Sequence, residues 1–161
     1  LAGSFAHVHL SFGLKEAAMN VKTILAAKGG DIYSIDPTAN LAAAATLLST
    51  HRIGAAVIRG AGGRLAGILS ERDIVRAVSE HGAAALALPV GQVMTRNVTT
   101  CGEDDSIADI MERMTDGKFR HVPVLKNNKL VGVISIGDVV KQRVEEVERD
   151  ADAMRDYIQT A

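Results

Sequence analysis

The spacing of hydrophobic residues predicts the order of secondary-structure elements along the chain. Continuous apolar runs at Ala55 to Ile58 and Leu65 to Leu69, joined by a Gly-rich stretch, predict a β-hairpin. Apolar positions at steps of three and four across residues 41–48 predict a helix, and Asp31 to Ile35 predicts a short strand before it. A second helix follows the hairpin from about Glu71 to Val78. The predicted order is therefore strand, helix, strand, strand, helix.

This order of elements occurs twice in the chain. Leu65 to Val75 recurs 65 residues later as Leu130 to Val140, with five of eleven residues identical. Upstream, Ile35 to Ile58 aligns with Cys101 to Leu125, and both segments contain apolar residues at helical spacing. A repeat of about 60 residues is too short to bury its hydrophobic faces well alone. We therefore expect the two repeats to pack face to face around one shared core.

The chain divides by pattern into four parts. An extension at residues 1–18 precedes the repeats at 19–82 and 83–140, and an amphipathic helix is predicted at 141–161. Two interpretations of the final helix stay open, because its apolar stripe could pack on its own domain or against a partner's matching helix. The stripe follows a heptad pattern formed by Val140, Val144, Val147, Ala151, Met154 and Ile158.

Composition excludes several classes of function. The net charge is −1, the isoelectric point is near 6.6 and Trp is absent, so the chain lacks the basic face and stacking residues expected for nucleic-acid binding. The only cysteine, Cys101, excludes an intramolecular disulfide and fits a reducing cytoplasm. His7 and His9 have no third ligand at a suitable spacing, so no metal requirement is expected. No apolar run is long enough to span a membrane, and we expect a cytoplasmic protein.

The repeat resembles a known family over Val21 to about Val144. The resemblance is carried by an opening helix (Val21 to Leu25, and Val93 to Thr95), by the loop Phe119 to Val124, and by Gly-x-x-Ser-x-x-Asp in both copies. Together, in this order and duplicated, they resemble the cystathionine β-synthase (CBS) domain pair, or Bateman module. The resemblance implies an α/β (α+β) fold of two β-α-β-β-α repeats related by pseudo-twofold symmetry. It also implies two clefts that bind adenosine-containing ligands.

The duplicated Ser-x-x-Asp motif has two interpretations. The pairs Ser70 and Asp73, and Ser135 and Asp138, could each form a capping box that closes a helix start without any ligand. The family resemblance favours a second role, in which the Asp carboxylate accepts both ribose hydroxyls while the Ser hydroxyl and helix N-terminus face phosphate. The Ser can cap and bind at once.

The two repeats differ where a phosphate would need positive charge. Arg120 and His121 in the second repeat align with Gly54 and Ala55 in the first, whose small side chains would let a flat base approach the backbone. Arg72 lies inside the first Ser-x-x-Asp motif and has no basic counterpart in the second. We expect two unlike clefts, with these basic residues converging on phosphate as the resemblance implies.

Three further site residues come from the resemblance. Ser34 and Thr100, aligned at the end of the first strand of each repeat, match family positions whose backbone reads adenine, and Pro123 belongs to the loop that carries Arg120 and His121. Arg120 and His121 also have an alternative interpretation without a ligand. Arg120 could lie at a solvated strand end, and His121 could be a histidine at a sheet edge whose hydrogen bonds are satisfied within the protein.

The resulting hypothesis is a non-catalytic sensor of adenine nucleotides that signals to an unknown effector protein. AMP is the first choice of ligand, with ADP or ATP in the same class and NAD(H) second in one cleft. The resemblance also implies a homodimer. A structural dimer or adaptor with vestigial clefts is the alternative, and an enzyme using a bound nucleotide is a third, although no set of nucleophile, base and orienting group can be assembled.

Overall fold

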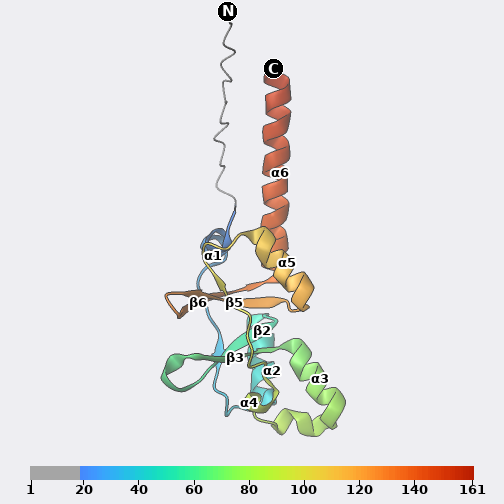
Figure 1. Cartoon of the computed structure of the whole chain (residues 1–161). Coiled ribbons are helices and arrows are strands. Elements are labelled where there is room, and N and C mark those ends of the chain that lie inside the picture. Colours follow the sequence, from blue (N-terminus) through green and yellow to red (C-terminus); the bar gives the residue numbers. More distant parts are fainter. Residues whose placement is uncertain (1–18) are drawn as a thin grey trace, which may run out of the picture.

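The structure is a computed structural model that describes residues 19–161, in which two similar units are stacked (Figure 1). The first unit contains a sheet of β1 (Ser34–Ile35), β2 (Ala55–Arg59) and β3 (Leu65–Ser70). β1 runs parallel to β2, and β2 pairs with β3 as an antiparallel hairpin. The hairpin and the short strand before it are confirmed.

The second unit repeats this sheet. β4 (Cys101–Gly102), β5 (His121–Lys126) and β6 (Lys129–Ser135) have the same order, with β4 parallel to β5 and β5 antiparallel to β6. The two registers also correspond, because Ile35 pairs with Ile58 and the aligned residue Cys101 pairs with Val124. The tandem α+β fold predicted from the repeat is confirmed.

The two main helices of each unit begin at matching positions. α2 (Leu41–His51) and α5 (Ile107–Gly117) end at residues in the left-handed conformation, Arg52 (φ 51°) and Lys118 (φ 56°). α3 (Glu71–His81) and α6 (Ile136–Thr160) follow the last strand of each unit without an intervening loop. Each therefore places its N-terminus at the end of a β-hairpin.

The opening segments of the two halves are exchanged. α1 (Val21–Lys28) packs in the hydrophobic core of the second unit, beside Ile107 and Ile110. The 3₁₀ segment η2 (Gly82–Ala87) and α4 (Val90–Val93) pack in the core of the first unit. The expectation of one shared core was wrong, because the buried residues form two hydrophobic clusters. The exchange ties them together, since each half of the chain completes the other's core.

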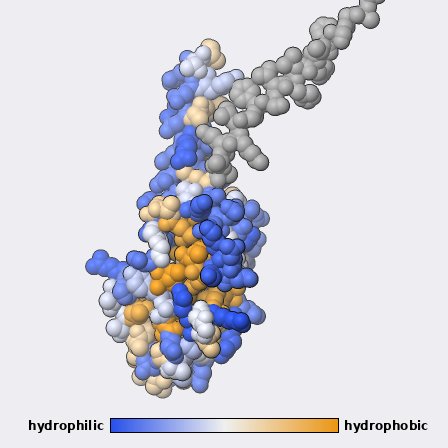
Figure 2. All heavy atoms as spheres, turned by 90° about the vertical axis from the view of Figure 1, so that its left-hand side faces the viewer, coloured by the Kyte–Doolittle hydropathy of each residue, from blue (hydrophilic) through white to orange (hydrophobic). Residues whose placement is uncertain are grey.

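The last helix leaves the body of the molecule. α6 is buried only near its start, at Val139 and Gln142, and its C-terminal part projects away from both units (Figure 1). In the face shown in Figure 2, this projecting part is mainly hydrophilic with hydrophobic residues scattered among the charges, whereas the body shows a continuous hydrophobic area. Val144, Met154 and Ile158 are 50%, 61% and 67% exposed, so the alternative that this stripe packs on its own domain was wrong.

Across residues 19–161, no helix combines the length and the apolar character needed to cross a membrane.

Candidate functional site

Both Ser-x-x-Asp motifs form capping boxes at helix starts. Asp73 Oδ2 accepts a hydrogen bond from the Ser70 amide at 2.8 Å, and the Asp73 amide donates to Ser70 Oγ at 3.3 Å. The same two bonds join Ser135 and Asp138, at 2.8 and 3.2 Å. The capping interpretation is therefore confirmed in both copies. It leaves the second oxygen of each carboxylate outside the cap.

The start of α6 opens into a cavity of about 520 Å³ between the two units. This volume lies within the usual range of small-molecule sites, about 300 to 1,000 Å³. Both halves of the chain contribute predicted site residues to its wall. These residues are Gly54 and Ala55 at the start of β2, Arg120 and His121 at the start of β5, and Ser135 and Asp138. We call it the Asp138 cavity.

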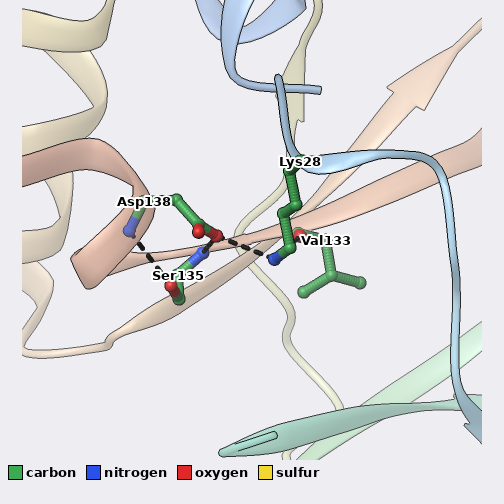
Figure 3. Close-up of polar contacts among 4 residues, drawn as sticks. All are labelled: Lys28, Val133, Ser135 and Asp138. Atoms are coloured by element: carbon green, nitrogen blue, oxygen red, sulfur yellow. Dashed lines mark hydrogen bonds and ion pairs between the residues drawn. The ribbon is translucent and has the colours of Figure 1, made fainter. Parts of the chain in front are cut away.

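A lysine from the exchanged helix α1 holds Asp138. Lys28 Nζ lies 2.7 Å from Asp138 Oδ2 and donates to the Val133 carbonyl at 2.8 Å (Figure 3). Burial acts to raise the pKa of Asp138, but hydrogen bonds from Lys28 and from the Ser135 amide outweigh it and lower the pKa below its ordinary value of 3.8. The Asp138 carboxylate is therefore ionised at neutral pH and able to accept hydrogen bonds.

The start of α3 opens into a second cavity of about 430 Å³, which we call the Asp73 cavity. The predicted residues Ser70, Arg72 and Asp73 line it together with Arg120 and His121. Asp73 itself is 9% exposed, and Arg76 lies 3.8 Å from its Oδ1. The convergence of Arg72, Arg120 and His121 on one site, expected from the sequence, is present in the geometry.

His121 and Arg120 form a wall shared by the two cavities, because both residues line both. A Cβ on Gly54 would lie 3.0 Å from Cε1 and from Nε2 of His121, so the absence of a side chain at Gly54 makes room for this imidazole. Burial, followed by the charge of Lys28, lowers the pKa of His121 below 6.5. The imidazole is therefore neutral at neutral pH and can both donate and accept a hydrogen bond.

Three predicted site residues are not brought to either cavity wall. Ser34 and Thr100 each miss by one position, since their neighbours Tyr33 and Thr99 line the Asp138 and Asp73 cavities respectively. Pro123 is buried inside β5. The Tyr33 ring stacks on the imidazole of His51 with centroids 4.0 Å apart, as part of the protein's own packing.

The cavity walls contain basic residues that the sequence reasoning missed. Arg52 lines the Asp138 cavity and Lys118 lines the Asp73 cavity, each from the left-handed residue that ends a helix. These two align in the repeat at a shift of 66, so a basic residue at equivalent positions was a usable signal. Lys28 had no such signal, because it belongs to no duplicated motif, whereas Arg76 aligns with Lys141 at a shift of 65.

The one cysteine takes no part in the cavities. Burial and the nearby charge of Asp105 raise the pKa of Cys101 to about 12, so its thiol stays protonated and packs in the second core. Within the part of the chain that the structure describes, no group of three or more His, Cys, Asp or Glu side chains could hold a metal ion. His7 and His9 lie outside the described residues.

A family model for the CBS domain matches the chain twice, at residues 22–80 and 90–145. Curated relatives include an uncharacterized 17.7 kDa protein of Acidianus ambivalens, 35% identical over 68% of this chain and 66% of its own length. The mitochondrial CBS domain-containing protein CBSX3 of Arabidopsis thaliana is 34% identical over 70% of this chain. The match spans 56% of that relative's length, so the chain corresponds to only part of it.

Solved structures agree with the family match. The CBS-domain-containing protein ATU1752 of Agrobacterium tumefaciens is 47% identical, with a TM-score of 0.76 over 78% of this chain and 94% of its own. The CBS domain pair of protein MJ0100, solved with 5′-methylthioadenosine and S-adenosyl-L-methionine, is 25% identical with a TM-score of 0.71, over 80% of this chain and 98% of its own. The two repeats, the exchanged helices and these matches together show that the chain belongs to the CBS domain family and contains a CBS domain pair.

Proposed function

We propose that the chain is a non-catalytic regulatory module that binds adenosine-containing ligands in the Asp73 and Asp138 cavities and signals their occupancy to an effector protein. The observation that carries the proposal is the duplicated carboxylate, Asp73 in one cavity wall and Asp138 in the other, on the fold of the CBS domain family. The CBS domain pair of MJ0100, which shares that fold, binds two adenosine compounds. Such a role is also the general one for CBS domain pairs, which are regulatory rather than catalytic.

The ribose role is compatible with capping. In both motifs the capping box uses Oδ2, and at Asp138 the same Oδ2 also accepts from Lys28. Within residues 19–161, Oδ1 of Asp138 accepts no hydrogen bond. A carboxylate has about four acceptor sites, so the remaining ones suffice for the two hydroxyls of a ribose. We therefore assign Asp73 and Asp138 as the ribose ligands.

The charge of the walls favours different ligands in the two cavities. Three cationic side chains face three carboxylates in the Asp138 cavity, so a ligand of low charge fits there: AMP, or an uncharged nucleoside. Four cationic side chains face only Glu71 and Asp73 in the Asp73 cavity, which favours a polyphosphate such as ADP or ATP. The four are Arg72, Arg76, Lys118 and Arg120.

NAD(H) is the weaker choice for the Asp138 cavity. NAD(H) would need free space beside Gly54 and Ala55 for its second nucleoside. The imidazole of His121 fills that space at Gly54, where an added Cβ would lie within 3.0 Å of two ring atoms. AMP remains the first choice.

Ligand identification tests the proposal. The purified chain is denatured, released small molecules are identified by mass spectrometry, and calorimetry follows with AMP, ADP, ATP, 5′-methylthioadenosine, S-adenosylmethionine and NADH. We expect the Asp73→Asn, Asp138→Asn double variant to lose affinity at least tenfold, because a charge-assisted hydrogen bond contributes about 1.5 to 3 kcal/mol.

Asp109→Asn is the matched control. Ser106 and Asp109 form a third Ser-x-x-Asp at the start of α5, but Asp109 is exposed and lines neither cavity. The affinity of the Asp109→Asn variant for each adenosine ligand should equal that of the unaltered chain. Absence of any adenosine ligand, or equal affinity in the double variant, would contradict the proposal, and ATP turnover abolished by Asp73→Ala would contradict its non-catalytic part.

A further inference from the structure

The apolar stripe of α6 has no cover in the part of the chain that the structure describes. This stripe, the α6 seam, has exposed fractions of 44% at Val140, 51% at Val147 and 67% at Ile158. The body contacts another face of the helix, where Val139 and Gln142 are buried. At about 100° per residue, these two positions lie well away from the seam around the helix axis. The seam therefore lies on a face of α6 that the body does not cover. The C-terminal part of this helix projects away from both units (Figure 1).

We propose that the α6 seam pairs with the α6 seam of a second copy of this chain as a parallel, in-register, two-stranded coiled coil. In heptad terms, Val144, Ala151 and Ile158 occupy position a, and Val140, Val147 and Met154 occupy position d. A narrow seam of strict a and d positions is typical of a coiled coil.

Charges beside the seam select the second copy as the partner. In a parallel pair, each g residue faces the e residue five positions later on the other helix. Arg143 then faces Glu148 of the second copy, and Asp150 faces Arg155 of the second copy. Both contacts join opposite charges. Because the pair has twofold symmetry, each contact occurs twice in the dimer.

The same charges oppose an antiparallel pair. With the two seams fully overlapped in opposite directions, Glu148 would face Glu148 of the second copy and Asp150 would face Asp150. Lys141 would face Arg155 in that arrangement. All three contacts are between like charges, so charge favours the parallel orientation.

Existing ion pairs on α6 are compatible with these contacts. Arg143 Nη1 lies 2.6 Å from Glu146 Oε2, and Arg155 Nη1 lies 3.1 Å from Asp152 Oδ1, both within one helix. A guanidinium carries five donors, so each arginine can also reach a carboxylate of the second copy. The first turns of α6 are already formed in the folded body. The pairing of two α6 helices therefore does not have to supply the free energy of helix nucleation.

A single substitution on the seam tests the pairing in the full chain. Sedimentation velocity over a range of concentrations should show a reversible dimer. Val147→Asp should weaken it at least tenfold, because each dimer would bury two carboxylates against apolar side chains. Ala153→Asp, an exposed position on the other side of α6, introduces the same charge and should change dimerisation less than twofold. A monomer at every concentration, a larger oligomer, or a dimer that tolerates Val147→Asp would overturn the proposal.

Cross-linking tests the orientation. In a parallel pair, Ala151 faces Ala151 of the second copy, so Ala151→Cys in a Cys101→Ala background should oxidise rapidly to a disulfide-linked dimer. Ala153→Cys in the same background is the control and should not. In the antiparallel arrangement Ala151 would face Val147, and cross-linking only of a mixture of Val147→Cys and Ala151→Cys chains would overturn the parallel orientation.

Discussion

Lys28 and Asp138 lie 110 residues apart in the chain and 2.7 Å apart in the structure. The contact depends on the exchange of opening helices, because α1 packs in the second core and delivers its last residue to the start of α6. One carboxylate therefore caps a helix, pairs with Lys28 and faces the Asp138 cavity (Figure 3). Changing Lys28 should alter the ligands that this cavity prefers.

Lys28→Met should lower the affinity for AMP relative to 5′-methylthioadenosine several-fold. The lysine supplies one of three cations around the cavity and also occupies Oδ2 of Asp138. Its loss removes attraction for phosphate while it frees an acceptor for ribose. Calorimetric titration of both ligands measures the ratio, with Lys22→Met, an exposed position on the same helix, as control. An unchanged ratio would show that Lys28 does not face the phosphate.

Asp138 should contribute stability that depends on pH. Its pKa is below 3.8 in the folded chain, so the folded state binds its proton less readily than the unfolded state does. The contribution is present above the unfolded pKa and is lost as pH falls through the folded pKa. Urea unfolding from neutral pH to about pH 3 should therefore show a smaller acid loss for Asp138→Asn. At neutral pH this variant should be about 1 kcal/mol less stable, since it also weakens a helix cap. Equal acid losses would contradict the lowered pKa.

Phosphate binding should be linked to protonation of His121. In the free chain the pKa of His121 lies below 6.5, chiefly because of burial. A bound phosphate would raise it, so binding should take up a proton and strengthen as pH falls from about 7.5 to 6. Calorimetry of AMP in buffers of different ionisation enthalpy measures the uptake. His121→Gln should abolish it, and proton uptake that persists in this variant would assign the linkage to another group.

Gly54→Ala should disturb both cavities through one added methyl group. That Cβ would lie 3.0 Å from two atoms of His121, which lines both walls. We expect weaker ligand binding at both sites and a loss of about 1 to 3 kcal/mol in stability from overpacking. Gly102→Ala is the control, because nothing lies within 4 Å of its Cβ position. Equal melting temperatures and affinities for the two variants would contradict the close contact.

Local pattern was sufficient to predict most elements of the fold. The hairpins and helices follow from periodicity, and each Ser-x-x-Asp marks a helix start in the structure. The motif itself is not specific for a cavity, since Ser106 and Asp109 repeat it on the exposed start of α5. Position in the repeat distinguishes the two cavity motifs from the third, because only these two lie at equivalent positions of the two repeats.

Tertiary packing explains what the sequence did not reveal. Nothing in the local pattern of Val21 to Lys28 indicates that this helix joins the second core, so Lys28 could not be assigned to Asp138. Arg76 lies one helical turn after Asp73, and only the direction of α3 shows that it faces the cavity. Ser34 and Thr100 were placed one residue from the lining positions, within the usual uncertainty of strand alignment.

The cytoplasmic location and the identity of the effector stay predictions. A link between ligand and effector is available in α6, because this helix starts at Asp138 and continues into the exposed seam. A ligand changes the seam only if it binds two states of the chain with different affinity. Adding AMP during sedimentation of the full chain should therefore shift the dimer constant if α6 transmits occupancy. An unchanged constant at saturating AMP would exclude α6 as the transmitting element.

The stoichiometry of ligand binding tests the central claim most directly. Calorimetric titration of ATP and AMP into the chain, into Asp73→Asn and into Asp138→Asn separates the two cavities. We expect the unaltered chain to bind one adenosine ligand in each cavity, Asp73→Asn to lose chiefly the ATP site, and Asp138→Asn to keep it. Binding of both nucleotides that neither substitution weakens, or no binding of either nucleotide to the unaltered chain, would contradict the assignment of these two carboxylates as ribose ligands.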